Sequence, residues 1–140
     1  MNSPICIDAS IIIRLLVGGE GAEQVATLWQ EWKTSDHQLV APSLMPYEVA
    51  NVLHQHVRHG SLQPVEADEA LHIALSLNIQ LYRETALHTQ AVRLARELEL
   101  PATYDAHYLA LAQQLGAFFW TADQRLIRMV DNKLDFLRGI

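Results

Sequence analysis

The chain of 140 residues is half hydrophobic, and only 19% of its residues are charged. This composition argues against intrinsic disorder and predicts one folded domain over residues 1–140. The single cysteine, Cys6, excludes an internal disulfide framework and a zinc site built on a CxxC motif. With 16 acidic and 10 basic residues, the net charge is −6, which excludes nucleic-acid binding by a general basic excess.

The N-terminus and the apolar runs predict the compartment. The first residues lack the basic stretch and the long apolar segment of a signal peptide. Arg14 interrupts the longest apolar run, which leaves it well short of the roughly 18 residues of a membrane helix. We therefore expect a cytoplasmic protein with no membrane partner.

Short apolar segments alternate with helical patterns along the chain. The first half predicts a strand at residues 5–7, an apolar run at 11–17, a helix at 20–32, a strand at 39–41, a helix capped by Ser43 and ended by Gly60, and a helix opened by Pro64. The second half predicts a strand at 79–82, helices at 87–98 and 104–116, an aromatic strand at 117–120, a short helix around 126–130 and a last strand at 136–137. This alternation favours right-handed crossovers, and therefore a three-layer α/β/α fold with a parallel central sheet of four or five strands.

Four acidic residues are placed where they can form one site beyond the carboxyl ends of the predicted strands. Asp8 directly follows the first strand, and Asp123 follows the aromatic strand. Asp105 lies in the first turn of the helix that leads into the aromatic strand. Glu48 lies in an otherwise apolar part of the helix after the second strand. Because ligands of open α/β sheets bind beyond the carboxyl ends of the strands, these four side chains can point into one cleft.

A cluster of carboxylates has a definite chemistry. Its members repel one another and take up protons unless a cation neutralises them. Hard oxygen ligands suit Mg²⁺ or Mn²⁺ better than Zn²⁺, and such ions can activate water for phosphodiester hydrolysis. Purely structural roles stay open for three of the four, since Asp8 and Asp123 can cap helices and Asp105 can interact with a helix dipole. Glu48 is harder to explain in this way, because Glu is rarely placed on an apolar helix face without a partner.

The four acids stand in four short motifs. The motifs are Ile7-Asp8-Ala9-Ser10, Tyr47-Glu48-Val49-Ala50-Asn51-Val52-Leu53, Tyr104-Asp105-Ala106-His107-Tyr108-Leu109-Ala110-Leu111-Ala112 and Trp120-Thr121-Ala122-Asp123. In this order and at this spacing they resemble the motifs of PIN-domain ribonucleases, in particular those of the small VapC-type toxins of type II toxin–antitoxin pairs. The resemblance runs from Asp8 to Asp123 and so covers nearly the whole chain.

The resemblance implies a PIN-like fold and a Mg²⁺- or Mn²⁺-dependent endoribonuclease whose substrate is RNA. The residues that it implies as catalytic and metal-binding are Asp8, Glu48, Asp105 and Asp123. Polar neighbours that would support ligands or water are Ser10, Asn51 and Thr121. The resemblance also implies a cognate antitoxin and a second copy of the chain, in a homodimer, as partners. The family often has a further acid shortly after the position of Asp123, where this chain has Gln124 and Arg125.

Other features leave more than one interpretation open. A cationic group at the end of the helix that carries Glu48 is compatible with a zinc site, with helix-dipole partners or with a rim for RNA; its members are His54, His56, Arg58 and His59. Five aromatic residues have the spacing of core positions and predict packing; they are Trp29, Trp32, Phe118, Phe119 and Trp120. The alternatives for the whole chain are a non-catalytic α/β interaction module with structural acids, and a PIN-like nuclease that is not a toxin.

Overall fold

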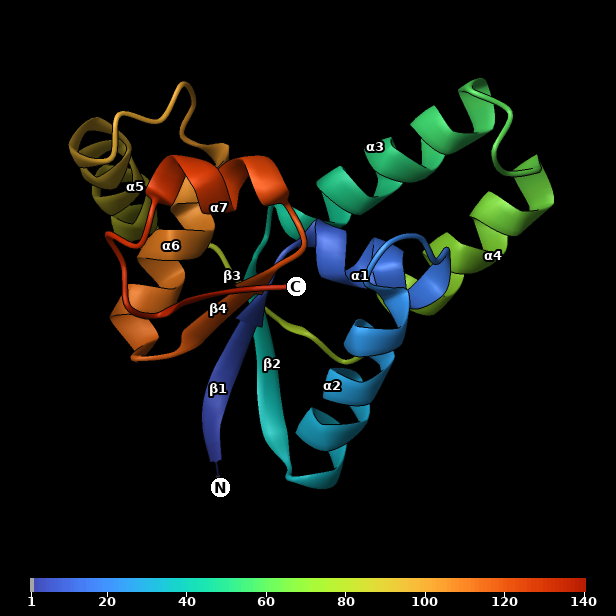
Figure 1. Cartoon of the computed structure of the whole chain (residues 1–140), viewed down its shortest axis with the longest axis horizontal. Helices are drawn as coiled ribbons and strands as arrows, with labels where there is room; N and C mark the ends of the chain where they lie inside the picture. The colour runs from blue at the N-terminus through green and yellow to red at the C-terminus, as the bar shows by residue number, and fades with distance from the viewer. Residues whose placement is uncertain (1) are drawn as a thin grey trace.

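The structure, a computed structural model, describes residues 2–140 and forms three layers (Figure 1). Within these residues, five strands form one sheet of order β3-β2-β1-β4-β5, and every neighbouring pair is parallel. The strands are β1 (Asn2–Ile7), β2 (His37–Pro42), β3 (Gln80–Tyr82), β4 (Phe118–Thr121) and β5 (Leu137–Gly139). The predicted α/β/α fold with a parallel sheet of four or five strands is confirmed.

The helices lie on both faces of the sheet. One face carries α1 (Ala9–Leu16), α2 (Ala22–Thr34), α3 (Met45–Arg58) and α4 (Pro64–Leu75), and the other carries α5 (Thr85–Glu97), α6 (Tyr104–Leu115) and α7 (Gln124–Val130) (Figure 1). The α3–α4 pair packs as a helical hairpin that extends away from the sheet. None of the helices in residues 2–140 combines the length and the hydrophobicity needed to cross a bilayer.

The strand order places a crevice beside β1. The chain runs from β1 outward through β2 to β3, returns to β4 on the other side of β1, and ends at β5. The connections therefore leave β1 and β4 toward opposite faces of the sheet, which is the arrangement of a topological switch point. Ile7 pairs with Trp120, so the segments that carry Asp8 and Asp123 leave neighbouring strands at nearly the same level.

The core lies between the sheet and its two helical layers. Cys6 and Ile7 of β1 are fully buried, and α6 packs against β1, β2 and β4 with a run of small and apolar residues. The ring of Tyr108 stacks on that of Phe119, with centroids 5.6 Å apart. Burial of both faces at the end of β1 explains why residues 5–7 are continuously apolar rather than alternating.

Two details of the sequence prediction are wrong. Leu44, not Ser43, precedes the first turn of α3, and no side chain caps this helix. The Ser43 N–H instead donates to the carbonyl oxygen of Tyr82 at 2.8 Å, which extends the contact between β2 and β3. Phe118 is not a core residue, because it is 46% exposed at the start of β4 and the guanidinium of Arg138 lies 4.3 Å from its ring centroid.

Candidate active site

A cavity of about 260 Å³ opens at the switch point. All four predicted acids line it, and they come from four segments of the chain: Asp8 precedes α1, Glu48 lies in the first turn of α3, Asp105 in the first turn of α6, and Asp123 precedes α7. The topology therefore brings together side chains that are up to 115 positions apart in the sequence.

Asp8 and Asp123 both cap helices, as the structural interpretation of these residues predicts. Asp8 is the N-cap of α1, and its Oδ1 accepts hydrogen bonds from Ser10 N–H at 3.0 Å and Ile11 N–H at 3.4 Å. Asp123 caps α7 in the same way, accepting from Arg125 N–H at 3.0 Å. In both residues capping occupies Oδ1 alone, so capping and a second role for the carboxylate in the cavity are compatible.

Two hydroxyl groups hold the Asp8 carboxylate in place. The Ser10 hydroxyl donates to Oδ1, and the Thr121 hydroxyl donates to Oδ2 at 2.5 Å. Ser10 Oγ also accepts from Ala122 N–H at 2.8 Å, and Thr121 Oγ1 accepts from Asp123 N–H at 3.0 Å. Both residues therefore connect the start of α1 to the loop after β4.

Asn51, the third predicted supporting residue, lies elsewhere. It is exposed on α3 and does not line the cavity. The residues of α3 that do line the cavity are Glu48, Val52 and His56, each four positions after the last and thus on one face of the helix. The structure does not bring Asn51 to the four acids.

Replacing Thr121 by Val tests this network. Thr121 is fully buried, and Val has nearly the same shape but no hydroxyl, so the buried Oδ2 of Asp8 and N–H of Asp123 lose their partner. We expect Thr121→Val to lower the free energy of unfolding by about 1–3 kcal/mol in chemical denaturation. Thr121→Ser keeps the hydroxyl and is the control; equal losses in the two variants would contradict a role for the hydrogen bonds.

Tyr108 holds Glu48, a role that was not predicted from the sequence. Its hydroxyl donates to Glu48 Oε1, and its ring is fully buried against Phe119. A buried tyrosine hydroxyl needs a hydrogen-bond partner, and Glu48 supplies it. The available signal was the spacing, because Tyr108 follows Asp105 by three positions and therefore lies near it on the surface of α6.

Burial and mutual repulsion favour protonation of three of the acids. Burial, and secondarily the charge of Asp105, raises the pKa of Asp8 to about 7, against the opposing effect of its hydrogen bonds from Ser10 and Thr121. Burial and the charges of Asp105 and Asp123 raise the pKa of Glu48, although the Tyr108 hydroxyl opposes the shift. Burial and Asp123 raise the pKa of Asp105, and Arg125 opposes this. A bound cation would reverse these shifts by stabilising the charged forms.

The donor set fits a hard divalent cation. The cavity offers carboxylate oxygens from four residues and no thiolate, which suits Mg²⁺ or Mn²⁺. Among residues 2–140, no three His, Cys, Asp or Glu side chains are grouped closely enough to hold an ion by themselves. Mg²⁺ in proteins usually keeps several waters and takes only one or two carboxylates together with substrate phosphates. A closed cluster of three protein ligands is therefore not required, and the carboxylate oxygens of the cavity are donors of the right kind.

The cationic group predicted at the end of α3 divides in two. His56 lines the cavity, and its Nδ1 lies 2.8 Å from Ser61 Oγ. His54, Arg58 and His59 are exposed. The structure therefore gathers no zinc cluster from these four residues within the part of the chain that it describes. The spacing of eight positions from Glu48 could have identified His56 as a neighbour of the acids.

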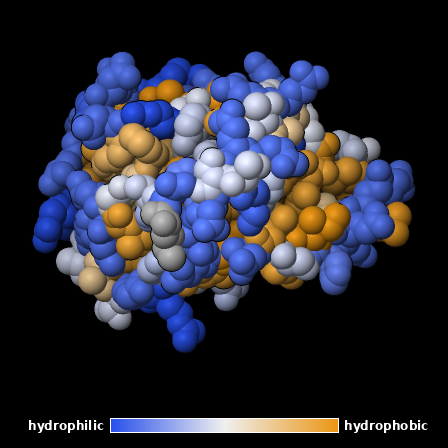
Figure 2. Space-filling model, turned by 90° about the horizontal axis from the view of Figure 1, so that it is seen from below, coloured by the Kyte–Doolittle hydropathy of each residue, from blue (hydrophilic) through white to orange (hydrophobic). Residues whose placement is uncertain are grey.

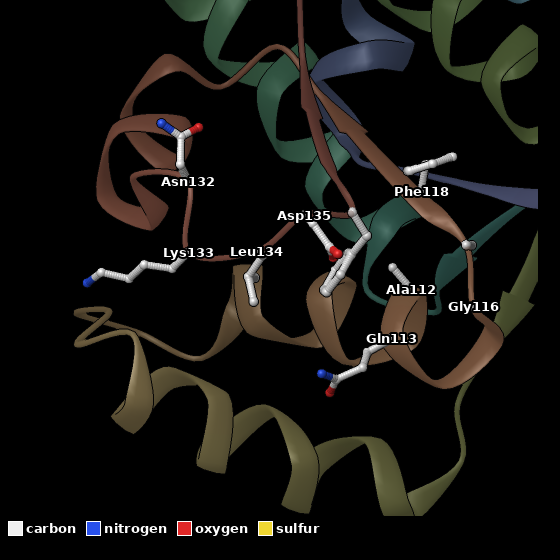
Figure 3. Close-up of a pocket in the computed structure, with 10 residues that line it drawn as sticks. Ala112, Gln113, Gly116, Phe118, Asn132, Lys133, Leu134 and Asp135 are labelled. Atoms are coloured by element: carbon white, nitrogen blue, oxygen red, sulfur yellow. The ribbon is translucent and has the colours of Figure 1, made fainter.

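A larger cavity, of about 640 Å³, lies away from the acids (Figure 3). Its wall is formed by the end of α6, the start of β4 and residues 132–136, and it holds none of the four predicted carboxylates. This cavity is at the amino end of β4, whereas sites in open α/β sheets form at the carboxyl ends of the strands. The smaller cavity is therefore the better candidate for an active site.

Comparisons with known proteins identify the family of the chain. The model of the PIN domain family matches residues 5–132. Ribonuclease VapC3 of Pyrobaculum aerophilum is 33% identical over 129 residues, which cover 87% of this chain and 91% of that protein.

Two solved structures share the fold. PAE2754 from Pyrobaculum aerophilum has a TM-score of 0.72 at 24% identity, over 99% of this chain and 92% of that chain. A chain of a toxin–antitoxin complex from Klebsiella pneumoniae has a TM-score of 0.66 at 18% identity, over 96% and 95% of the two chains. The predicted resemblance is confirmed, and the chain belongs to the PIN-domain family, with a VapC ribonuclease among its relatives.

Proposed function

We propose that this protein is a divalent-metal-dependent endoribonuclease that hydrolyses RNA phosphodiester bonds, and that it is the toxin of a toxin–antitoxin pair. One observation carries the proposal: four carboxylates from four separate segments line one cavity at the switch point of a PIN fold. The relative named as a ribonuclease, aligned over 87% of this chain, supports the reaction class. We assign Asp8, Glu48, Asp105 and Asp123 as the catalytic and metal-binding residues.

The chain's own residues prepare the site for a cation and a phosphate. When bound, Mg²⁺ or Mn²⁺ supplies Lewis-acid stabilisation of phosphate oxygens and lowers the pKa of a coordinated water. Ser10 and Thr121 fix both oxygens of Asp8, and Tyr108 fixes Glu48, so these two carboxylates are held before any ligand arrives. Such pre-positioning lowers the reorganisation required during the reaction.

Charge explains how an acidic protein attracts RNA at this place. Without a cation, four carboxylates repel a phosphate, but a bound divalent ion becomes the largest local charge and reverses the field. Arg14 and His56 line the same cavity, and Arg125 is close enough to Asp105 to lower its pKa. The guanidinium groups of Arg14 and Arg125 and the ring of His56 offer contacts to the flanking phosphates of the RNA backbone.

Metal removal is the first test of the proposed function. We expect EDTA to abolish cleavage of single-stranded RNA by the purified protein, and excess Mg²⁺ or Mn²⁺ to restore it, because carboxylate oxygens are the donors in the cavity. The measurement is the release of labelled fragments from RNA, with Ca²⁺ and Zn²⁺ as comparison ions. Full cleavage in EDTA would contradict the metal-dependent site.

The antitoxin and a second copy of the chain are the proposed protein partners. Exposed apolar side chains lie on α4, where Val65, Ile73 and Leu75 are 69%, 45% and 64% exposed. Hydrophobic side chains also gather on the side of the molecule that carries α2 and the α3–α4 hairpin (Figure 2). The structural neighbour from Klebsiella pneumoniae is itself part of a toxin–antitoxin complex. We assign this apolar side to protein contacts and place the protein in the cytoplasm.

A non-catalytic module with structural acids is the main alternative. In that case the carboxylates would serve only as helix caps and dipole partners, and divalent ions would not change stability. A ligand that binds the folded state alone raises the melting temperature by mass action. Mn²⁺ should therefore raise the melting temperature of a metal-dependent nuclease and leave that of a non-catalytic module unchanged. The raised pKa values of three of the four acids favour the cation-binding site.

A further inference from the structure

A further cavity, of about 280 Å³, lies next to the acids and has no part in the chemistry described above. Its wall is aromatic and apolar for the most part, with Tyr47, Tyr82 and Tyr104 around it and two histidines, His88 and His107, at one side. Its volume is just below the roughly 300–1,000 Å³ of sites for drug-sized ligands. It therefore suits one flat ring system and little more.

This aromatic cavity shares its walls with the acidic cavity on two separate helices. On α3, Tyr47 lines the aromatic cavity and its neighbour Glu48 lines the acidic one. On α6, Tyr104 and Asp105 divide in the same way. Because adjacent Cα atoms are about 3.8 Å apart, the two cavities lie side by side at the carboxyl edge of the sheet.

Two of the tyrosines have no packing role in the fold. Tyr47 is 76% exposed and Tyr104 is 62% exposed, and neither ring belongs to the hydrophobic core. No side-chain hydrogen bond within residues 2–140 involves either hydroxyl, whereas the buried Tyr108 has one to Glu48. Large exposed aromatic side chains at the rim of a cavity are typical of surfaces that bind another molecule.

The two histidines add polar recognition. His107 Nδ1 lies 2.7 Å from the Thr103 carbonyl oxygen, so in its neutral form this nitrogen carries the proton. His107 Nε2 is then an acceptor for His88 Nδ1, at 2.8 Å, and the remaining His88 Nε2 is an acceptor as well. Arg83 also lines the cavity and supplies N–H donors suited to the edge of a base.

We propose that the aromatic cavity binds a nucleobase that is turned out of the RNA chain, next to the phosphate held at the acidic cavity. This inference rests on the proposed ribonuclease function. Single-stranded RNA is recognised by unstacked bases that lie on Tyr, His or Arg side chains and form hydrogen bonds through their edges. The continuity with the acidic cavity on two helices favours RNA over a protein partner, and the exposed apolar residues of α4 do not line this cavity.

A titration with nucleoside monophosphates tests the site without any need for cleavage. AMP, GMP, CMP and UMP are each added to the protein, and NMR follows the ring signals of the tyrosines and histidines. We expect the signals of Tyr104 and His107 to shift with at least one nucleotide, and inorganic phosphate alone to leave them unchanged. Absence of any such shift at millimolar concentration would overturn the proposal, whether or not the protein cleaves RNA.

Cleavage kinetics then test the link between the two cavities. The substrates are labelled homopolymers of about twelve ribonucleotides. We expect Tyr47→Ala and Tyr104→Ala to lower kcat/KM by roughly 5- to 150-fold, the range for base–aromatic stacking. Tyr47→Phe and Tyr104→Phe keep the ring and most of the activity. Phe118→Ala removes an exposed ring outside both cavities and is the matched control, with no change expected.

Abasic substrates separate the outcomes. Removing one base beside the cleaved bond should lower the kcat/KM of the wild-type protein as much as Tyr104→Ala does. The variant acting on the abasic substrate should show no larger loss of kcat/KM than either change alone. If the two losses of kcat/KM multiplied in full, the proposal would be overturned. It would also be overturned if the Tyr→Ala variants changed their oligomeric state and still cleaved RNA at the wild-type rate. A protein that cleaves no RNA but shows the nucleotide shifts would refute the ribonuclease function and leave the nucleobase site intact.

Discussion

Asp8→Asn is expected to lower the rate of RNA cleavage by at least about 100-fold while the fold stays intact. The substitution removes a negative charge from the centre of the acidic cavity, and loss of a positioned catalytic or metal-binding group typically costs a factor of about 100 or more. Asn is as good an N-cap as Asp, and its side-chain oxygen can keep the hydrogen bonds from Ser10 and Ile11. Steady-state cleavage of labelled RNA in Mg²⁺ measures the loss, and circular dichroism verifies the fold.

Asp68→Asn is the matched control for this prediction. Asp68 is exposed on α4 and does not line the acidic cavity, so the same chemical change should leave cleavage unchanged. The same two variants also test whether the protein is a toxin. Expression of the wild-type chain or of Asp68→Asn without an antitoxin should arrest growth, and expression of Asp8→Asn should not.

Undiminished cleavage by purified Asp8→Asn would contradict the assignment of Asp8 to the active site. Normal growth of cells that express the active protein would indicate a PIN-like nuclease that is not a toxin.

The stability of the metal-free protein is expected to fall as the pH rises toward neutrality. The pKa of Asp8 is about 7 in the folded protein against an ordinary value of 3.8, so the folded state binds the proton more tightly than the unfolded chain does. This contribution is fully present below about pH 4 and is lost as the pH rises through about 7. A tenfold difference in proton affinity is worth about 1.36 kcal/mol, so the loss amounts to about 4 kcal/mol for this buried group.

Chemical denaturation of wild type and Asp8→Asn in EDTA, between about pH 4 and pH 8, measures this difference. Because Asn does not titrate, the variant should lack this part of the pH dependence and be the more stable of the two near pH 8. Adding Mn²⁺ near pH 8 should stabilise the wild type and leave the variant almost unchanged, since the cation binds the ionised carboxylates of the folded state. Parallel pH profiles for the two proteins would contradict the pKa shift of Asp8.

The regular elements could be predicted because their signals are local. The apolar run of β1 ends at Asp8, and the helical spacing of α4 begins at Pro64 as expected. Gly116 ends α6 with a left-handed backbone conformation, at φ 63°, which is a common use of glycine. The prediction failed at Ser43, where a contact between β2 and β3 replaced the helix cap, and at Phe118, which lies exposed at the start of β4.

The residues of the candidate site could be predicted only in part. Asp8 and Asp123 lie just after β1 and β4, Thr121 ends β4, and the parallel topology places these strand ends at one edge of the sheet. Glu48 and Asp105 lie in the first turns of α3 and α6. The role of Asn51 could not be judged, because one position along a helix turns a side chain by about 100° and the sequence does not say which face of α3 meets the cavity. His56 and Tyr108 lie beside the acids for the same reason, because the rotation of α3 and α6 turns these side chains toward them.

The sequence by itself determined the order of strands and helices, the α/β class and the four acids, since hydrophobic periodicity and turn residues act over a few positions. Only the tertiary structure decided that these acids share a cavity, that Tyr108 holds Glu48, and that Tyr47 and Tyr104 line a second cavity beside them. The physical reason is that strand order and helix rotation follow from burying the whole core at once, and no local stretch of sequence carries that information.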